Sequence, residues 1–422
     1  MKARIILICI LSILPFSIAF AQGSLKISLL EAEKMFLQEN AQLIAQRFQT
    51  EQAKAEIITA KLFDNPELSY ENVFYNHETG KFLETSRATG QYSASITQVI
   101  KLASKRNKDI QLAETGVQLA AYAYFDLMRT LRFELRSTFY ETYYKQLSTS
   151  VYEQLIVSLT QLLNASEQQL KLGNIASKDV IRIKSRLYSL KAEYTSFQND
   201  LEALKSRLKL LTNIQVDKEL ILSGEGIDPT QFRPADQPIA LLLDSARANR
   251  ADLKLAKTDL TYAQNMLAVQ KANAVPNVAV SLSYDLKGNY PEKYTGLGIS
   301  VPIPLFNRNQ GEIKKAKIAI EASKAAMKKQ ETELELEIYT SYKAAIKTES
   351  LYRSLDQDFA RSFEELMRGV IKNYQDRNMS LLEFLDFYDA YKESTYQLNG
   401  IQNELMNAKE TINYQTGITI FK

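Results

Sequence analysis

Cysteine, histidine and tryptophan are scarce or missing in this chain, and each shortage removes a class of chemistry. Of 422 residues, one is cysteine, one is histidine and none is tryptophan. The cysteine, Cys9, lies in an apolar stretch near the start, so the rest of the chain offers no disulfide, thiolate metal site or cysteine nucleophile. His77 lies in the polar loop YNHETGKF, where an exposed histidine without a catalytic role is the ordinary interpretation. With no glycine-rich phosphate loop and no clustered carboxylates outside two helical turns, the inventory argues against an enzyme and predicts no cofactor and no metal site.

The chain also lacks a large excess of positive or negative charge and, after residue 21, any long apolar run. There are 52 Lys and Arg against 49 Asp and Glu, so no net field indicates nucleic acid as a partner. After residue 21, no stretch is long and apolar enough for a membrane helix. Residues 1–21 begin with Lys2 and Arg4, continue as an apolar run and end in Ala-Phe-Ala, which predicts an export signal cleaved before Gln22. A membrane anchor is the alternative. An exported chain of this kind is either soluble or crosses a membrane as a barrel.

One stretch, Tyr294–Ala316, reads as a strand that runs directly into a long helix. In YTGLGISVPIPLFNRNQGEIKKA, apolar residues first alternate with small or polar ones, which predicts a strand with one apolar face. Pro302 and Pro304 cannot donate backbone hydrogen bonds, so they end the ladder. Asn307 is a suitable N-cap for the helical pattern that follows.

The same arrangement, a strand that runs directly into a helix, occurs earlier in the chain and predicts an internal duplication. The connector KLASKRNK, after another alternating stretch, matches PLFNRNQG in position, so that Leu102 corresponds to Leu305. Upstream, Pro66 corresponds to Pro276. The chain is therefore expected to contain two copies of one unit. The expected division is a signal peptide over 1–21, a first structural repeat over 22–212, a linker over 213–237 and a second structural repeat over 238–422.

Helical patterns flank the strands and predict two long hairpins. Helices are expected over 28–63, 106–172, 178–212, 238–273, 310–375 and 381–416. At ~1.5 Å per residue, the second of these would be about 100 Å long, which no globular domain needs. Gly173-Asn174 and residues 376–379 are the predicted turns, with Ser177 and Ser380 as helix caps. The pattern is typical of antiparallel coiled-coil hairpins.

The predicted strands have the length and alternation of membrane barrel strands. They are expected over 68–75, 92–100, 277–285 and 294–303. Apolar rows such as Leu68, Tyr70 and Phe74 alternate with polar residues, as in strands that face lipid on one side. Four strands cannot close a barrel with a lumen, so several chains must share one barrel. A face of a soluble sandwich is the alternative.

This order of elements behind a signal peptide resembles the TolC-like outer membrane efflux proteins over essentially the whole mature chain. The strand exit PIPLFNRNQGEIKKA and the turns LKLGNIASKDVIRIKSRL and YQDRNMSLLEFLDFYDAY are similar to motifs of that family, in the form common in its heavy-metal and multidrug branches. The resemblance implies a mostly helical fold with a membrane β-barrel. In it, a homotrimer contributes four strands per chain to a twelve-stranded barrel, and the long antiparallel hairpins form a periplasmic tunnel.

The function implied by the resemblance is that of the outer-membrane channel component of a tripartite efflux pump. Such a channel is a passive duct in the outer membrane, surrounded by lipid, and it does not bind nucleic acid. A periplasmic adaptor connects it to an inner-membrane pump, with a pump of the resistance-nodulation-division type favoured by the motifs. A periplasmic coiled-coil adaptor and an exit channel of type I secretion are the alternatives. A metal cation, a drug or a secreted peptide would each fit as the exported substrate.

By the same resemblance, the second hairpin turn carries gate residues. Tyr374 matches the family's tip tyrosine, and Glu383 and Asp386 fall at the acidic positions where the family narrows its pore. Three copies of each carboxylate around one axis would favour cations and raise one another's pKa values. The alternative is an ordinary solvated helix face that complements the helix dipole.

The resemblance also assigns a latch and a docking surface to the two turns. Asp179 matches a tip aspartate that pairs with the neighbouring hairpin. The chain departs from the family where a Gly is often followed two residues later by Arg, because it has Arg377 and then Met379. Arg377 would then supply the latch cation from a shifted position. Adaptor contact is expected, together with Arg377, at four further residues: Gly173, Asn174, Ile175 and Asn378.

Overall fold

The structure is a computed structural model that describes residues 24–288, 292–356, 358–376 and 378–422. The predicted export signal over 1–21 and the predicted gate residue Arg377 lie outside these residues. Two compact units are distinguished. One contains the described residues within 1–40, 134–229 and 355–406, and the other contains those within 41–133, 230–354 and 407–422.

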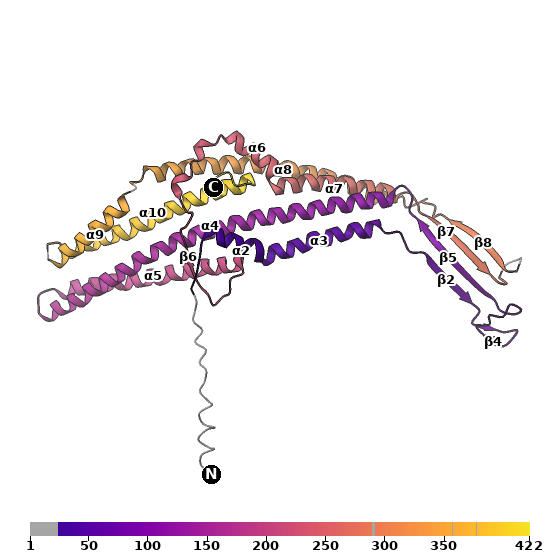
Figure 1. Cartoon of the computed structure of the whole chain (residues 1–422), viewed down its shortest axis with the longest axis horizontal. Coiled ribbons are helices and arrows are strands. Elements are labelled where there is room, and N and C mark those ends of the chain that lie inside the picture. The colour runs from indigo at the N-terminus through magenta and orange to yellow at the C-terminus, as the bar shows by residue number, and fades with distance from the viewer. Residues whose placement is uncertain (1–23, 289–291, 357, 377) are drawn as a thin grey trace, which may run out of the picture. The chain divides into compact units, whose positions relative to one another are not determined.

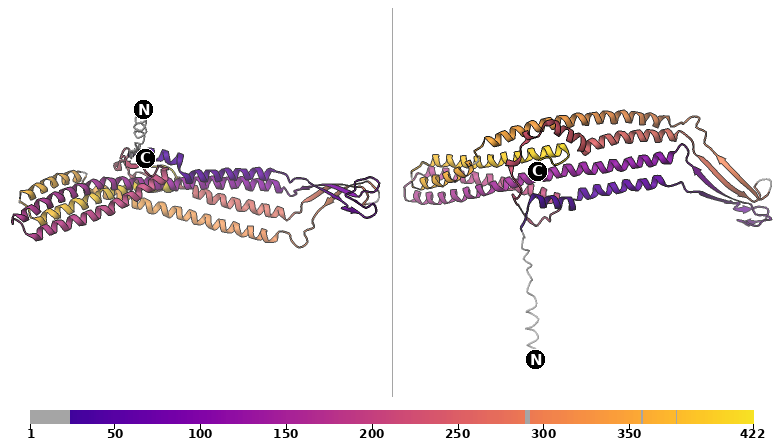
Figure 2. Two further views of the ribbon diagram at one scale, coloured as in Figure 1. Left: turned by 90° about the horizontal axis from the view of Figure 1, so that it is seen from below. Right: turned by 45° about the horizontal axis from the view of Figure 1, so that its top comes forward.

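The first unit is built on two helical hairpins. Its elements are β1 (Ser24–Ile27), α2 (Leu29–Glu39), the larger part of α4 (Lys105–Lys171), α5 (Ser177–Thr212), β6 (Glu219–Leu222), α9 (Phe359–Gln375) and the larger part of α10 (Leu381–Thr416). The hairpin of α4 and α5 lies alongside that of α9 and α10 (Figure 2). β6 is a short strand within the predicted linker, and it pairs in parallel with β1, a strand that the sequence did not predict.

The second unit combines helices with a four-stranded sheet (Figure 1). Its elements are α3 (Ala41–Lys61), β2 (Glu67–Asn72), β3 (Tyr75–Asn76), β4 (Lys81–Phe82), β5 (Tyr92–Ile100), the first part of α4, α6 (Ile239–Asn249), α7 (Ala251–Asn273), β7 (Val278–Asp285), β8 (Tyr294–Ser300), α8 (Gln310–Ser354) and the last part of α10. Two short 3₁₀ helices, η1 (Pro229–Gln231) and η2 (Pro234–Asp236), precede α6.

The sheet is antiparallel throughout, in the order β2-β5-β7-β8. Its register places Leu68, Ile96, Leu282 and Leu297 side by side in one row across all four strands. These side chains are 76%, 46%, 53% and 75% exposed. The neighbouring row, on the opposite face, holds Ser69, Ser95, Ser283 and Gly296. One face of the sheet is therefore apolar and exposed, and the other is small and polar.

Two helices that the sequence predicted as continuous are each interrupted once, so these predictions were wrong in detail. The 28–63 stretch divides into α2 and α3 at Asn40, whose buried side chain donates from Nδ2 to the carbonyl oxygen of Leu211 at 2.9 Å. The 238–273 stretch divides into α6 and α7 at Arg250, which is 2% exposed and forms ion pairs with Asp252 and Glu337. In both cases the residue at the break has an extended backbone, and its buried polar side chain binds a partner that is distant in the sequence.

The predicted helix over 310–375 is also interrupted, and its continuity was wrong. α8 ends at Ser354 and α9 begins at Phe359. Between them, a side-chain oxygen of Asp356 accepts a hydrogen bond from the Asp358 amide at 3.0 Å, and its carbonyl accepts one from the Phe359 amide at 3.1 Å. An aspartate that bonds the backbone in this way competes with the helical ladder.

The three predicted helix caps have different outcomes. Asn307 is wrong, because α8 begins at Gln310 and Asn309 directly precedes it; the Asn307 side chain accepts instead from the Asn309 amide at 3.0 Å. Ser380 is confirmed, because its Oγ accepts from the Glu383 amide at 3.2 Å while its own amide donates to Glu383 Oε2 at 2.9 Å, which together form a capping box. Ser177 is wrong as the N-cap of α5, since Ala176 occupies that position without a side-chain hydrogen bond.

Among the helices that the structure describes, none combines the length and the apolar character that crossing a membrane requires.

Candidate functional site

The four helices of the first unit share one apolar core near the hairpin turns. Buried side chains of the core come from all four helices, including Leu159 of α4, Ile183 of α5, Val370 of α9 and Phe384 of α10. Tyr388 of α10 is 1% exposed, and its hydroxyl donates to the carbonyl oxygen of Leu155 on α4. Burial raises the pKa of this tyrosine, so the hydroxyl keeps its proton and stays a donor. The two hairpins are therefore packed together through a continuous interior.

The first turn has the geometry that its sequence predicts. Gly173 has φ +74°, the left-handed region that favours glycine. Its amide donates to Leu170 O and that of Asn174 donates to Gln169 O, both at 2.9 Å, as at a glycine-terminated helix end. Gly173 and Asn174 are exposed, whereas Ile175 is half-buried against the shared core.

The second turn repeats part of this pattern. The amide of Asn378 donates to Asn373 O at 2.8 Å, so a bond spanning five residues closes the end of α9 as Asn174 closes that of α4. Asn378 is exposed, and Met379 packs against the shared core. The exposed residues of both turns thus belong to one unit.

Asp179 and Tyr374, predicted as gate residues on different hairpins, lie close enough for the charge of Asp179 to act on Tyr374. Tyr374 is half-buried, with its ring centroid 4.7 Å from that of Phe384. Burial raises its pKa, and the negative charge of Asp179 raises it further. The carboxylate of Asp179, in the first turn of α5, therefore lies within electrostatic range of Tyr374, in the last turn of α9.

Glu383 and Asp386 lie in the first two turns of α10, and both are exposed. The hydrogen bonds from the Ser380 hydroxyl and amide lower the pKa of Glu383. Within one chain, Glu383 is thus held ionised at the positive end of the helix dipole. This direction is opposite to the one expected from a ring of like charges around a shared axis.

Two ion pairs between α5 and α10 were missed by the sequence reasoning. Arg186 pairs with Asp389, and Glu193 pairs with Lys392, so the charges are reversed from one pair to the next. Burial acts to raise the pKa of Glu193, but the hydrogen bond and the charge of Lys392 outweigh it, and the pKa is lowered. No local pattern could reveal these pairs, because the partners lie on different hairpins about 200 residues apart.

One face of α10 carries exposed acidic side chains along most of its length. Glu383, Asp386, Glu393 and Glu404 are separated by three, seven and eleven positions, spacings that return to one side of a helix. No ion pair to these four carboxylates occurs within the part of the chain that the structure describes.

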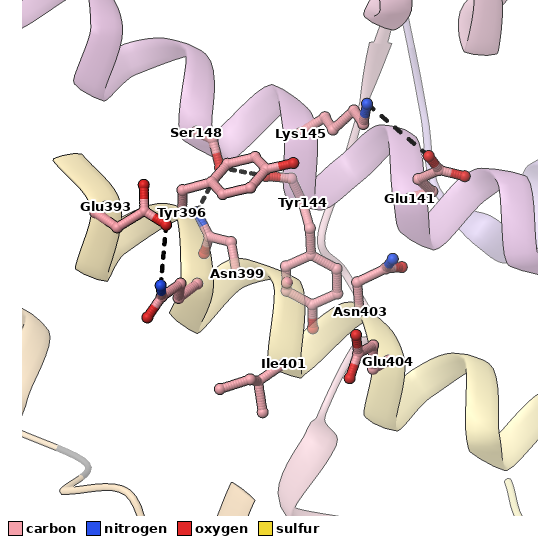
Figure 3. A pocket seen from close by; sticks show the side chains of 12 residues that line it. Glu141, Tyr144, Lys145, Ser148, Glu393, Tyr396, Asn399, Ile401, Asn403 and Glu404 are labelled. Carbon is pink, nitrogen blue, oxygen red and sulfur yellow. Dashed lines mark hydrogen bonds and ion pairs between the residues drawn. The ribbon is translucent and has the colours of Figure 1, made fainter. Parts of the chain in front are cut away.

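A cavity of about 500 Å³ lies between α4 and α10 along this face (Figure 3). Glu393, Tyr396 and Glu404 line it from α10, and Glu141 and Lys145 line it from α4. At one edge, Asn399 donates from Nδ2 to Ser148 Oγ at 2.8 Å, which ties the helices together. The acidic face of α10 therefore continues from the hairpin turn into a polar recess.

No group of three or more His, Cys, Asp or Glu side chains is arranged to hold a metal ion among the residues that the structure describes.

Comparison with known proteins connects the fold to a family. A sequence profile described as Outer membrane efflux protein matches residues 242–370, from α6 through most of α9. The crystal structure of the Campylobacter jejuni CmeC outer membrane channel has a TM-score of 0.74 to this chain at 14% identity, over 93% of this chain and 87% of the channel. Residues 242–370 therefore resemble the outer membrane efflux protein family in sequence, and the fold of the chain resembles that of a solved outer membrane channel.

Two further proteins that resemble this chain are informative. Crystal structures of CusC, whose description refers to transmembrane channel formation, give a TM-score of 0.73 at 15% identity, over 92% of each chain. The cobalt-zinc-cadmium resistance protein CzcC of Cupriavidus metallidurans is 21% identical over 280 residues. That match spans 65% of this chain and 62% of CzcC. At the level of the family, the solved relatives are channels and not enzymes.

Proposed function

We propose that this chain is the outer-membrane channel component of a tripartite efflux pump. It acts as a passive homotrimeric duct, with its strands in the outer membrane and its helices in the periplasm. A periplasmic adaptor joins it to an inner-membrane pump of the resistance-nodulation-division type, which supplies the energy. The observation that carries the proposal is the row of Leu68, Ile96, Leu282 and Leu297, exposed across all four strands of the sheet.

An exposed apolar row of this kind is costly in water and favourable in lipid. The opposite face, with its serines and glycine, suits an aqueous lumen. β2 and β8 are the outer strands of the sheet, so each presents one unpaired edge within the chain. Three copies joined edge to edge, β8 to β2, would give a closed barrel of twelve strands. A periplasmic adaptor would have no use for such a lipid-facing sheet.

The proposed repeats extend over 22–212 and 238–422, behind a signal peptide over 1–21 and around a linker over 213–237. Their internal order supports this division. Each repeat begins with two helices that are separated by one buried polar residue. Two strands of the sheet and a long helical hairpin follow.

The hairpin turns are the proposed gate. Glu383 and Asp386 form the constriction, Asp179 and Tyr374 hold the two turns together, and Arg377 supplies the latch cation. The proposed adaptor contact consists of the exposed turn residues Gly173, Asn174 and Asn378, together with the half-buried Ile175. The proximity of Asp179 and Tyr374 within one chain supports this arrangement.

The cargo proposed for the duct is cationic, including divalent metal ions. The exposed carboxylates of α10 support this, because three copies facing one lumen would concentrate cations along it. CzcC is named for resistance to cobalt, zinc and cadmium, which agrees with this class of cargo. The inner-membrane pump, and not this duct, selects which cation is exported.

Single-channel recording tests the proposal. The full chain, extracted with detergent, is inserted into a planar bilayer and recorded with and without a trivalent cation on the side of the hairpin turns. Small, cation-selective openings that the trivalent cation blocks are expected. A protein that dissolves without detergent and conducts no current would overturn the proposal and favour the periplasmic coiled-coil adaptor.

A further inference from the structure

A second cavity, of about 450 Å³, lies in the other unit where β5 leads into α4. Its apolar wall is formed by Leu62, Phe63 and Ile100, and its polar side by Lys101, Ser104 and Arg106. The volume is within the range of sites that hold small ligands. The combination of an apolar wall and a cationic side indicates an amphipathic ligand with a negative group.

Arg106 is oriented by two contacts inside this cavity. Its Nε donates to the carbonyl oxygen of Lys61 at 2.9 Å, and its guanidinium carbon lies 4.2 Å from the ring centroid of Phe63. Neither contact uses the two terminal amino groups of the guanidinium. Such a pair of donors in a fixed plane matches two oxygens of a phosphate group.

The start of α4 adds further attraction for an anion. Ala103 and Ser104 have φ +55° and +54°, and α4 begins directly afterwards at Lys105. Ser104, Arg106 and Asn107 of this turn line the cavity, so the positive end of a 67-residue helix opens into it.

One carboxylate, Asp64, also lines the cavity. Lys101 Nζ lies 2.9 Å from its Oδ1 and neutralises it. The guanidinium of Arg106 is then the remaining net charge on the lining, and it favours an anion.

The apolar wall is continuous with the exposed apolar face of the sheet. Ile96 and Ile100 lie on the same side of β5, because side chains alternate along a strand. Ile96 belongs to the exposed apolar row, while Leu62 and Phe63 are 62% and 75% exposed. A ligand with its negative group at Arg106 would therefore extend its apolar part along the surface assigned to lipid.

We propose that this cavity is a binding site for an anionic phospholipid of the surrounding membrane. The phosphate diester binds Arg106, Ser104 and the start of α4, and the acyl chains lie along Leu62, Phe63 and Ile100. The site rests on the proposed function, since it requires the sheet to be in a bilayer. It would fix the depth of the chain at the boundary between strands and helices.

Native mass spectrometry of the detergent-extracted full chain tests the site. Phosphatidylglycerol is titrated against phosphatidylcholine with the same acyl chains. Wild type is expected to bind phosphatidylglycerol about tenfold more tightly, because the choline ammonium of phosphatidylcholine offsets the phosphate charge that Arg106 attracts. Arg106→Gln is expected to remove this preference, and Phe63→Leu to weaken it about threefold through loss of the ring beneath the guanidinium.

Arg308→Gln is the matched control. Arg308 lies at the corresponding connector after β8, where its Nε donates to Pro304 O at 3.2 Å, and it does not line the cavity. This variant is expected to change the preference less than about twofold. Circular dichroism and oligomer size verify that each variant is folded. If Arg106→Gln does not fold, Phe63→Leu still tests the site.

The other possible results distinguish failure of the lipid site from failure of the proposed duct. Equal binding of the two lipids, or equal loss in Arg106→Gln and Arg308→Gln, would overturn the lipid site. Displacement of the lipid by inorganic phosphate at similar concentration would assign the cavity to phosphate alone and would also overturn it. A failed lipid test with intact single-channel conductance would leave the proposed duct standing, whereas absent conductance would remove the duct itself.

Discussion

At the scale of single residues, Glu383 has two roles that different substitutions separate. Its carboxylate completes the capping box with Ser380, and its charge belongs to the exposed acidic face of α10. Glutamine retains an oxygen that can accept the Ser380 amide but carries no charge. Alanine removes both the acceptor and the charge. The cap and the proposed constriction can therefore be examined one at a time.

Glu383→Gln is expected to reduce cation selectivity and block by a trivalent cation while the start of α10 stays intact. Glu383→Ala is expected to show the same loss of selectivity together with fraying of α10, because the cap is gone. Single-channel recording measures the first effect, and hydrogen exchange of the amides at 381–385 measures the second. Full selectivity in Glu383→Gln would move the constriction elsewhere on the helix.

The pH dependence of this cap has a definite sign. The hydrogen bonds from Ser380 lower the pKa of Glu383 in the folded chain from its ordinary value of 4.5. The stabilising contribution is therefore fully present above pH 4.5 and is lost as the pH falls through the lowered value. Exchange of the same amides in the wild type should rise, relative to the intrinsic rate, only in that acidic range, and Glu383→Gln should lack the change.

At the scale of elements, the two hairpins of one chain are joined by more than their shared core. The pairs Arg186–Asp389 and Glu193–Lys392 connect α5 to α10, and the Tyr388 hydroxyl connects α10 to α4. The positive residue lies on α5 in the first pair and on α10 in the second. This arrangement fixes how α5 and α10 align along their lengths, because a shift of one helix would place like charges together. The pairs are partly exposed, so each contributes less than about 1 kcal/mol to stability and more to alignment.

Reversal of one pair tests this alignment. Arg186→Asp and Asp389→Arg are each expected to lower the midpoint of thermal unfolding, since each brings two like charges together. The double variant, which restores an ion pair of opposite polarity, should recover at least half of the loss. Circular dichroism of the detergent-extracted protein gives the midpoints. Additive losses in the double variant would mean that the pair does not couple the hairpins.

At the scale of the whole molecule, the four-stranded sheet decides whether the chain belongs in a membrane. Leu282 lies within the exposed apolar row, and Ser95 lies in the row on the other face. Arginine on a lipid-facing strand costs about 2–4 kcal/mol near the middle of a bilayer, whereas a lumen-facing position tolerates it. The two faces should therefore respond differently to the same new side chain.

Leu282→Arg is expected to reduce strongly the amount of assembled protein in the membrane fraction, and Ser95→Arg to leave it within about twofold of wild type. Density-gradient fractionation and oligomer size on gels provide the measurement. If both substitutions were equally tolerated, the row would face water and the sheet would not span a membrane.

Local sequence patterns determined much of this protein. Alternation gave strands close to β2, β5, β7 and β8, and Gly173 and Ser380 marked a turn and a cap, because backbone conformation there depends on neighbouring residues. The gate residues came from a family resemblance at the turns and stay predictions. Arg377 lies outside the residues that the structure describes.

Tertiary structure alone decided the features that need a distant partner. The breaks at Asn40 and Arg250 depend on Leu211 and Glu337, and the pairing of Arg186 with Asp389 joins separate hairpins. An asparagine or arginine in a helical pattern reads as a surface residue until the group that accepts its hydrogen bonds is known. Sequence periodicity specifies which face of an element is apolar, but it does not specify which buried polar groups will meet, since those contacts arise only when the elements pack.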